Sequence, residues 1–233
     1  MRIIKAKNRH YTDLEWLRTY WLFSFDTYHD PENMNFGNLR VFNDDIVAAK
    51  TGFPPHPHAN MEIVTVVLEG ELAHEDNAGN KGIVRPGDVQ HMSAGKGVVH
   101  SEFNHGKTSV HLYQIWLGPR KQQITPAYHQ QTFLPSKEES GLLPVASGES
   151  LPGAIPITAD ATVYLGTLKK AGLATFNVRP SHGAFVYVTQ GTLEIHGSEL
   201  LPGDQARISE EGMLNIKAKE ASRFILIEVD LTS

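Results

Sequence analysis

The chain has 233 residues, of which 40% are hydrophobic and 20% are charged, a composition typical of a globular protein that buries its own core. Its net charge of −5 and its scattered Lys and Arg residues argue against direct nucleic-acid binding, which calls for a basic patch. The absence of cysteine excludes disulfides, iron–sulfur clusters and thiolate zinc sites, so any metal must be held by His, Asp or Glu.

Neither a signal peptide nor a membrane span is expected. The first residues, MRIIKAKNRHYTDLEW, lack the continuous apolar core of a signal peptide. No window approaches the run of about 18 apolar residues that a membrane-spanning helix needs. We therefore expect a cytoplasmic protein with no membrane partner.

Short β-type runs separated by Gly, Pro and Asn or Asp clusters recur along the chain, and long stretches with helical periodicity are nearly absent. In chain order these runs are MEIVTVVLEG (61–70), SVHLYQIWL (109–117), ATVYLGTL (161–168), GAFVYVTQG (183–191) and RFILIEVDL (223–231). Their enrichment in Val, Ile, Thr and aromatic residues predicts an all-β sandwich or barrel.

The stretch from about residue 119 to 152 differs from the rest, because it is polar and rich in Pro, Gly and Ser. This composition indicates a connector, with one short helix near KEES (137–140). The expected organisation is therefore an N-terminal barrel over residues 1–120, a linker over 121–152 and a C-terminal barrel over 153–233.

The two β-rich halves resemble each other. Gly70 aligns with Gly191, and the turn Pro86-Gly87-Asp88 aligns with Pro202-Gly203-Asp204. A strand, a Gly-marked hairpin, a returning strand and a Pro-Gly-Asp turn occur in the same order in both halves. An internal duplication is the simplest account of this ordered pattern.

Two pairs of polar residues have the spacing of metal ligands. In GFPPHPHANMEIV (52–64), His56 and His58 are two residues apart, and the flanking prolines favour an extended backbone that points both imidazoles the same way. In GKGVVHSEFN (95–104), His100 and Glu102 have the same spacing. Two such pairs on neighbouring strands would bring three nitrogens and one oxygen together, a donor set that suits Fe, Ni, Cu, Mn, Co or Zn.

The sequence around these residues resembles known motifs. The two histidines, Glu62, LEG (68–70), PGD (86–88) and His100 are similar to the two cupin motifs. More narrowly, SFDTYHDPENMNFGNLRVFNDD, HPHANMEIVTVVLEGELAHEDNAGN and PGDVQHMSAGKGVVHSE resemble the pirin family. The resemblance is dense from about residue 15 to 120. It is weaker through the second half, whose pattern is similar to the second cupin of quercetinase-like pirins.

This resemblance implies a bicupin fold, in which two tandem jelly-roll barrels share one chain and the first barrel holds one metal ion. In pirins the metal is commonly iron and is bound by three histidines and a glutamate, which here are His56, His58, His100 and Glu102. Fe(II) is the expected ion, with Ni, Cu, Mn, Co and Zn as alternatives.

Glu62 is a competing carboxylate, because in many other cupins a glutamate at about this place is a ligand. It shares the strand parity of His58, so we expect it to face the barrel interior. There it would either hold an imidazole N–H of the site or form a structural salt bridge.

The second half lacks the ligand pattern. In the alignment of the two halves, Asn177 and Arg179 stand in place of the first histidine pair, and Ile216 and Ala218 in place of the second pair. We therefore expect the C-terminal barrel to hold no metal.

The remaining histidines are expected to play lesser parts. We expect His111 to be a core or pocket residue, and the others to be loop or surface residues: His74, His91, His105, His182 and His196. Met92 and Val98 are expected to form apolar walls of the site.

The resemblance to quercetinase-like pirins implies a metal-dependent dioxygenase that uses O₂ to cleave a flavonol such as quercetin and releases carbon monoxide. Glu102 would be both a ligand and the general base. A second interpretation is an iron-dependent regulator that acts through a protein partner, and a third is another cupin reaction such as a sugar isomerisation. A deep cavity at the site would favour the enzyme, and an exposed patch at its mouth would favour the regulator.

Overall fold

The structure, a computed structural model, describes residues 1–133, 140–149 and 151–232. These residues form β-strands joined by loops and turns, with one short 3₁₀ helix at Ala6–Asn8. None of the described segments forms a helix long and apolar enough to cross a membrane.

The first barrel is built from two sheets. The larger sheet has the order β12-β9-β6-β11-β4-β3-β2, with β12 at Ala127–Thr132, β9 at Asp88–Ser93, β6 at Glu62–Glu69, β11 at Val110–Leu117, β4 at Leu39–Val47, β3 at Leu17–Trp21 and β2 at His10–Asp13. The smaller sheet has the order β5-β10-β7-β8, with β5 at Gly52–His58, β10 at Val98–Phe103, β7 at Leu72–Asp76 and β8 at Lys81–Val84.

The second barrel repeats this plan. Its larger sheet has the order β1-β20-β17-β22-β15-β13-β14, with β1 at Arg2–Ile4, β20 at Gln205–Ile208, β17 at His182–Gln190, β22 at Ser222–Asp230, β15 at Ala161–Leu168, β13 at Gly141–Ser147 and β14 at Ile155–Pro156. Its smaller sheet has the order β16-β21-β18-β19, with β16 at Leu173–Val178, β21 at Gly212–Ala218, β18 at Leu193–Ile195 and β19 at Ser198–Leu200. The predicted all-β bicupin fold is confirmed.

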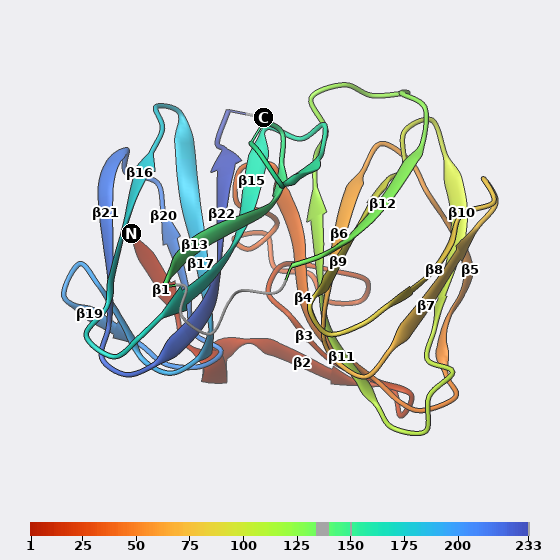
Figure 1. Cartoon of the computed structure of the whole chain (residues 1–233), viewed down its shortest axis with the longest axis horizontal. Helices are drawn as coiled ribbons and strands as arrows, with labels where there is room; N and C mark the ends of the chain where they lie inside the picture. The colour runs from red at the N-terminus through yellow and green to blue at the C-terminus, as the bar shows by residue number, and fades with distance from the viewer. Residues whose placement is uncertain (134–139, 150, 233) are drawn as a thin grey trace.

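The two barrels lie side by side with their larger sheets facing each other and their smaller sheets on the outer sides (Figure 1). Phe42 of β4 contacts Phe185 and Tyr187 of β17 across this interface, with ring centroids 5.3 and 4.9 Å apart. Because side chains alternate along a strand, the other face of β4 points into the first barrel. This alternation separates the interface from the candidate site.

The segment 121–152 is not the strand-free connector that its composition suggested. It contributes β12 to the first barrel, where the strand pairs with β9, and β13 to the second barrel, where the strand pairs with β15. Strand β12 is an edge strand whose side chains are largely exposed, so its sequence lacks the apolar alternation by which strands are recognised. The short helix expected near KEES falls on residues 137–139, which lie outside the described residues, and on Ser140, which is not helical.

The first strand of the chain belongs to the second barrel. Strand β1 pairs with β20, and the chain then crosses to the first barrel through β2 and β3 (Figure 1). In the proposed division into residues 1–120 and 153–233, strand β1 therefore belongs by its pairing to the second barrel, although it lies in the first range.

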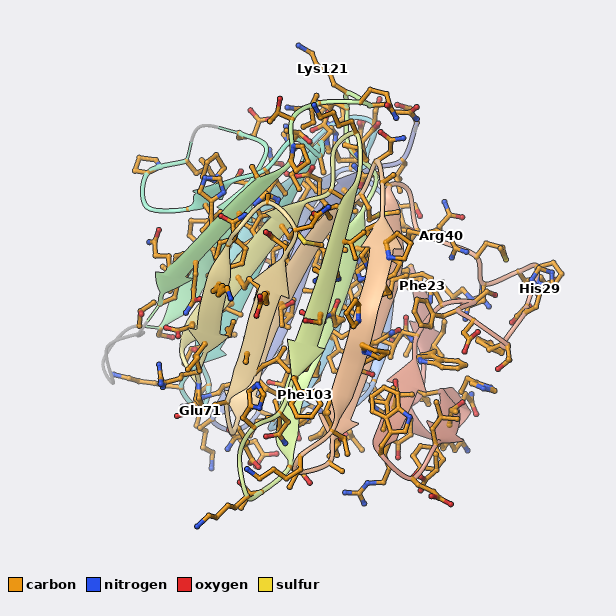
Figure 2. The ribbon with its side chains drawn as sticks, turned by 90° about the vertical axis from the view of Figure 1, so that its right-hand side faces the viewer. Phe23, His29, Arg40, Glu71, Phe103 and Lys121 are labelled. Atoms are coloured by element: carbon orange, nitrogen blue, oxygen red, sulfur yellow. The ribbon has the colours of Figure 1, made fainter. Side chains whose placement is uncertain are left out.

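The segment between β3 and β4, residues 22–38, projects from the side of the first barrel and carries His29 at its outer end (Figure 2). Closer to the barrel, the same segment contributes Phe25 and Asp26 to the rim of an internal cavity. On the small sheet, the neighbouring strands β5 and β10 carry the metal-ligand candidates.

Candidate metal centre

Strand β5 brings the first histidine pair to the second one. It lies at the edge of the small sheet and, among the described strands, pairs with β10 only. An edge strand tolerates prolines, because one side of its backbone has no neighbouring strand to hydrogen-bond. In this register His56 lies opposite His100, and His58 lies opposite Val98. The two sequence motifs therefore meet on neighbouring strands, as their spacing predicts.

Three imidazoles form one compact group. The ring centroids of His56 and His100 are 4.4 Å apart, those of His56 and His58 are 4.8 Å apart, and those of His58 and His100 are 5.0 Å apart. One potential ligand atom from each ring lies within 4.8 Å of the other two. The Nδ1–H of His56 donates to the carbonyl oxygen of Pro54 over 2.8 Å, which leaves its Nε2 as the free nitrogen.

Both remaining rings present a nitrogen without a partner. Nε2 of His58 and Nε2 of His100 are buried and have no hydrogen-bond partner among the described residues. Burial, reinforced by the neighbouring imidazoles, lowers the pKa of His58 to about 4 and that of His100 to about 2. The two rings are therefore neutral near pH 7, the state in which imidazole binds a metal.

Glu102 is oriented by a short chain of hydrogen bonds. Trp116 Nε1 donates to Gln114 Oε1 over 3.0 Å, and Gln114 Nε2 donates to Glu102 Oε2 over 2.6 Å. The Trp116 donor fixes the orientation of the amide, and Glu102 Oε1 stays buried without a partner. Burial, followed by the nearby Asp45 carboxyl, raises the pKa of Glu102 to about 8.

His74 also lies at this site, although the sequence analysis placed it on the surface. It is buried, and its potential ligand atom lies within 4.8 Å of those of His100 and Glu102, so His100 belongs to two overlapping groups. The signal that could have identified it is the alternation of Leu72, His74 and Asp76 in β7, which points all three inward.

His74 connects the cluster to a rigid turn. Its Nε2 lies 3.4 Å from Asp76 Oδ2, and its Nδ1 lies 3.4 Å from Nδ1 of His100. Asp76 is held by Asn80, whose backbone N–H and side-chain amide both donate over 2.9 Å. When His74 Nε2–H donates a hydrogen bond to Asp76 Oδ2, Nδ1 of His74 is an acceptor. It can then accept a hydrogen bond from Nδ1–H of His100, which leaves Nε2 of His100 free to bind a metal.

These donors fit a single divalent transition-metal ion. Neutral imidazole nitrogens and a carboxylate oxygen form two groups that share His100, one of His56, His58 and His100 and one of His74, His100 and Glu102, and three of the atoms are buried without partners among the described residues. Such atoms are costly to bury unless something binds them. The residues present therefore suit a resident metal ion of the kind that the sequence suggested, without defining which metal it is.

Glu62 does not face the site. It begins β6 on the side that faces the second barrel, where it accepts hydrogen bonds from Ser93 Oγ, over 2.6 Å, and from the backbone N–H and hydroxyl of Thr158. The parity count fails because Ala59–Met61 are outside a strand and Asn60 has a φ of +52°. Burial alone would raise the pKa of Glu62, but its hydrogen bonds, with that from His91 foremost, hold it at about 2.

His91 is buried as well, contrary to the expectation of a loop or surface position. Its Nε2 lies 2.7 Å from Glu62 Oε2, so Glu62 does hold an imidazole, but one outside the metal group. Met92 and Val98 are buried in a small cluster against which Trp116 packs, and they are absent from the described lining of the cavity beside the histidines.

The other histidines have structural or surface positions. His111 lies at the barrel interface, where Nε2 is 2.6 Å from Asp44 Oδ1. His182 is half-buried in β17 beside Asp160, and His105 and His196 are exposed. The expectation for His111 as a packed residue and for His105 and His196 as exposed residues is confirmed, whereas His182 is a strand residue.

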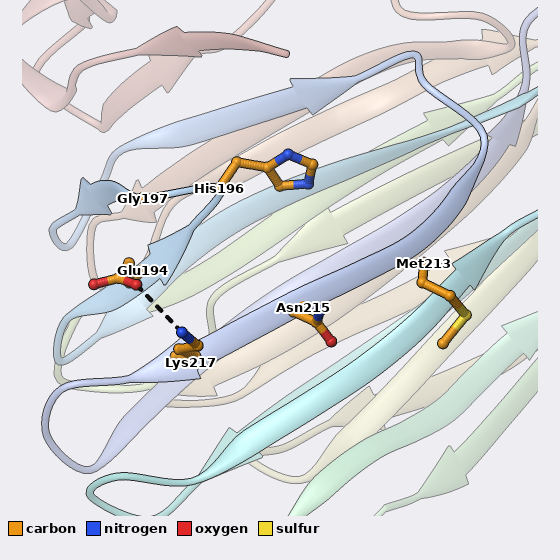
Figure 3. Close-up of a pocket in the computed structure, with 6 residues that line it drawn as sticks. All are labelled: Glu194, His196, Gly197, Met213, Asn215 and Lys217. Atoms are coloured by element: carbon orange, nitrogen blue, oxygen red, sulfur yellow. Dashed lines mark ion pairs between the residues drawn. The ribbon is translucent and has the colours of Figure 1, made fainter.

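The second barrel is filled at the corresponding positions. Ile216 and Ala218 are buried in an apolar cluster, together with Phe176 and Val178 of β16. Asn177 is exposed, and Arg179 is paired with Glu228, so the interior positions of this strand lie one residue earlier than the alignment placed them. The depression drawn in Figure 3 lies on the outer sheet of this barrel, where Glu194 and Lys217 form an ion pair.

A cavity of about 470 Å³ adjoins the cluster inside the first barrel. Its lining combines the candidate ligands with aromatic residues and a few polar ones. These residues are Leu14, Trp16, Leu17, Trp21, Phe25, Asp26, Asn43, Asp45, Phe53, His56, His58, His100, Glu102, Gln114 and Trp116.

Comparison with known proteins identifies two matching domain families. Residues 4–117 match the Pirin family, and residues 144–229 match the quercetinase C-terminal cupin domain. A pirin-like protein of Caulobacter vibrioides is 40% identical, over 93% of this chain and 94% of its own. A quercetin 2,3-dioxygenase of Escherichia coli is 37% identical, over 97% of this chain and 96% of its own.

Solved structures agree with these matches. The bacterial pirin YhhW of Escherichia coli, in complex with nickel(II), superimposes with a TM-score of 0.93 at 36% identity, over 98% of each chain. The identity, the coverage and the shared two-barrel architecture together establish the relationship. The chain belongs to the pirin family of the cupin superfamily, in its bicupin form.

Proposed function

We propose that this protein is a metal-dependent dioxygenase that cleaves flavonols such as quercetin with O₂ and releases carbon monoxide. We propose one divalent transition-metal ion per chain, held by His56, His58, His100 and Glu102, with Fe(II) as the physiological ion. Ni, Cu, Mn, Co and Zn suit the same donors, and availability decides among them in a purified sample.

The observation that carries the proposal is the position of the donor group beside a cavity with aromatic walls. Trp21, Phe25, Phe53 and Trp116 line this cavity together with the three histidines. A flat aromatic molecule packs favourably against such side chains, and a cavity of this size is of the order that small-molecule sites occupy. The quercetin 2,3-dioxygenases among the relatives support the same substrate class.

When bound, the ion would supply a Lewis acid that lowers the pKa of the substrate's 3-hydroxyl and a centre at which O₂ can react. Glu102 would accept the proton of that hydroxyl. Burial raises the pKa of Glu102, so its carboxylate, once ionised, is a stronger proton acceptor than an exposed one. The hydrogen bond from Gln114 to Oε2 would hold the Glu102 carboxyl in one orientation.

The regulator interpretation has less support. It needs a partner-binding patch at the mouth of the site, and of the described lining residues only Leu14 and Asp26 are exposed. A concave cavity beside the donor group suits a small molecule rather than a protein surface.

The metal site is tested by measuring bound metal in single alanine variants of His56, His58 and His100. Each variant should lose most of its metal, because each removes one of a few donors. His105→Ala, which removes an exposed histidine of the same barrel, is the control and should retain it. Near-complete retention in all three variants would contradict the proposed ligands.

The reaction is tested by reconstituting the protein separately with Fe(II), Ni(II), Cu(II) and Mn(II) and following quercetin under air and under argon. We expect quercetin loss and carbon monoxide release under air only. Equal loss without oxygen would contradict dioxygenation. No loss with any of these metals would favour the regulator, and a search for a protein partner would follow.

A further inference from the structure

We propose that Trp21, Asn43 and Asp45 form a polar strip that binds hydroxyl groups of the substrate other than the 3-hydroxyl. The ligand class is a planar aromatic molecule with several phenolic hydroxyls. This choice of ligand rests on the proposed function, and the strip goes beyond it by naming the residues that select the hydroxylation pattern.

The register of two strands, β3 and β4, places the strip in the cavity. Trp21 of β3 lies directly opposite Asn43 of β4, and Asp45 follows two residues later on the same face. All three residues line the cavity that also contains His56, His58, His100 and Glu102. A molecule seated beside the metal donors would therefore share one space with the strip.

Each residue of the strip has an unsatisfied polar atom. Trp21 Nε1, Asn43 Oδ1 and Asp45 Oδ1 are buried and have no hydrogen-bond partner among the described residues. The three side chains belong to residues that are 3%, 5% and 2% exposed. Buried polar atoms are nearly always paired in folded proteins, so one donor and two acceptors together indicate a binding partner.

Not every buried polar residue beside the cavity lacks partners, as Gln114 shows. Gln114 lies opposite Asn43 on the other side of β4, and its amide is satisfied by Glu102 and Trp116. Thr65, by contrast, is buried and unpartnered but does not line the cavity. Thr65 therefore provides a matched control for the loss of a buried polar group.

The chemistry of the strip favours phenolic hydroxyls. A hydroxyl both donates and accepts hydrogen bonds. It can therefore donate to Asn43 Oδ1 or Asp45 Oδ1 and accept from the indole N–H of Trp21. The aromatic walls formed by Phe25, Phe53 and Trp116 favour hydroxyls that are carried on a flat ring. An unsubstituted ring would leave all three polar atoms buried and unpaired.

The test compares two pairs of ligands with nickel(II)-loaded protein under argon, by titration of tryptophan fluorescence with calorimetry as a check. Quercetin and 3-hydroxyflavone share the 3-hydroxyl and the 4-keto group and differ in their other hydroxyls. Luteolin and flavone differ in the same way but lack the 3-hydroxyl. The variants are Asn43→Leu and Trp21→Phe, with Thr65→Val as control, each checked by far-UV circular dichroism.

We expect the wild type to bind the hydroxylated member of each pair roughly 10- to 100-fold more tightly, the range that corresponds to one or two buried hydrogen bonds. Asn43→Leu and Trp21→Phe should each reduce this preference several-fold, and Thr65→Val should preserve it. Equal binding within both pairs by the wild type would overturn the strip. So would a preference that survives in both strip variants, or one that Thr65→Val removes equally.

Failure of the proposed function gives a different result. If quercetin is not consumed in air with any metal, but the preference for luteolin over flavone is lost in the strip variants, the strip stands and the flavonol reaction does not.

Discussion

At the scale of single residues, two of the three imidazoles, those of His56 and His100, are oriented by what their other nitrogen contacts. His56 is fixed by the carbonyl of Pro54, and His100 by its contact with His74. Metal-bound histidines generally depend on such partners for their tautomer and orientation. We therefore expect the contacts of His74 with His100 and with Asp76 to raise the affinity of the site for a metal ion.

His74→Asn should weaken metal binding about 10- to 100-fold while leaving the fold intact, because it removes the imidazole whose two nitrogens contact His100 Nδ1 and Asp76 Oδ2. Competition with a fluorescent chelator for Ni(II) measures the affinity. His105→Asn, at an exposed position in the same barrel, should bind as the wild type does. An unchanged affinity in His74→Asn would show that His100 needs no help from its neighbour.

Glu102→Gln should separate binding from chemistry. It keeps the shape and one oxygen for the metal but removes the base, so metal content should fall partly while turnover falls by roughly 10²–10⁴. Metal analysis and quercetin consumption under air measure the two effects. Glu75→Gln is the matched control, since Glu75 is exposed on β7 in an ion pair with Lys81. Turnover near the wild-type level would exclude Glu102 as the base.

At the scale of secondary-structure elements, β6 has one face in the interface between the barrels and one face inside the first barrel. Val64 and Val66 pack into the interface between the barrels together with Glu62, while Ile63 and Thr65 point the other way. The contacts of Glu62 with Thr158 make it a polar link between the two barrels.

The contribution of Glu62 to the free energy of unfolding should decrease at acidic pH. The pKa of Glu62 is about 2 in the folded protein, below its ordinary value of about 4.5, so its ionised form stabilises the fold above pH 4.5. This contribution, roughly 3 kcal/mol at most, is lost as the pH falls from 4.5 towards 2. Urea unfolding should therefore show Glu62→Gln less stable than the wild type at pH 7, with a gap that narrows by pH 3.

The control for this experiment is Glu71→Gln, which removes an exposed carboxylate paired with Arg85 and should change little at either pH. A gap between Glu62→Gln and the wild type that stays constant from pH 7 to pH 3 would contradict the account.

The sequence predicted those elements whose pattern is local. The H-x-H and H-x-E spacings predicted the cluster because two residues on one strand face share a direction, and the prolines of β5 proved compatible with an edge strand. The position of Glu62 could not be predicted, since the irregular residues 59–61 reset the alternation. The roles of His91 and β12 depend on packing between segments far apart in the chain, which no local pattern reports.

At the scale of the whole molecule, the two barrels have apolar cores of their own, besides the core that they share. The second barrel contains an apolar cluster that includes Phe176, Leu193 and Leu226, and the first contains one that includes Leu72, Val84 and Leu112. The candidate metal site lies in a barrel that has an apolar cluster of its own apart from the site. The metal is therefore expected to add stability without being required for folding.

Removal of the metal with a chelator should leave the far-UV circular dichroism spectrum of a β protein. Linkage predicts that a metal at a thousandfold excess over its dissociation constant stabilises the fold by about 4 kcal/mol, so the melting temperature should fall. Collapse of the spectrum after chelation would instead place the metal among structural ions such as those of zinc fingers. Readdition of Ni(II) should restore the melting temperature.

The pairing of β1 with β20 has a consequence for synthesis in the cell. Ile4 pairs with Gln205, so the ribosome makes the first strand about 200 residues before its partner. At roughly 5–20 residues per second, that interval lasts on the order of 10–40 s. During that time the nascent chain can complete most of the first barrel, while β1 has no partner strand to pair with. The final closure of the second barrel then joins two strands that are synthesised about 200 residues apart.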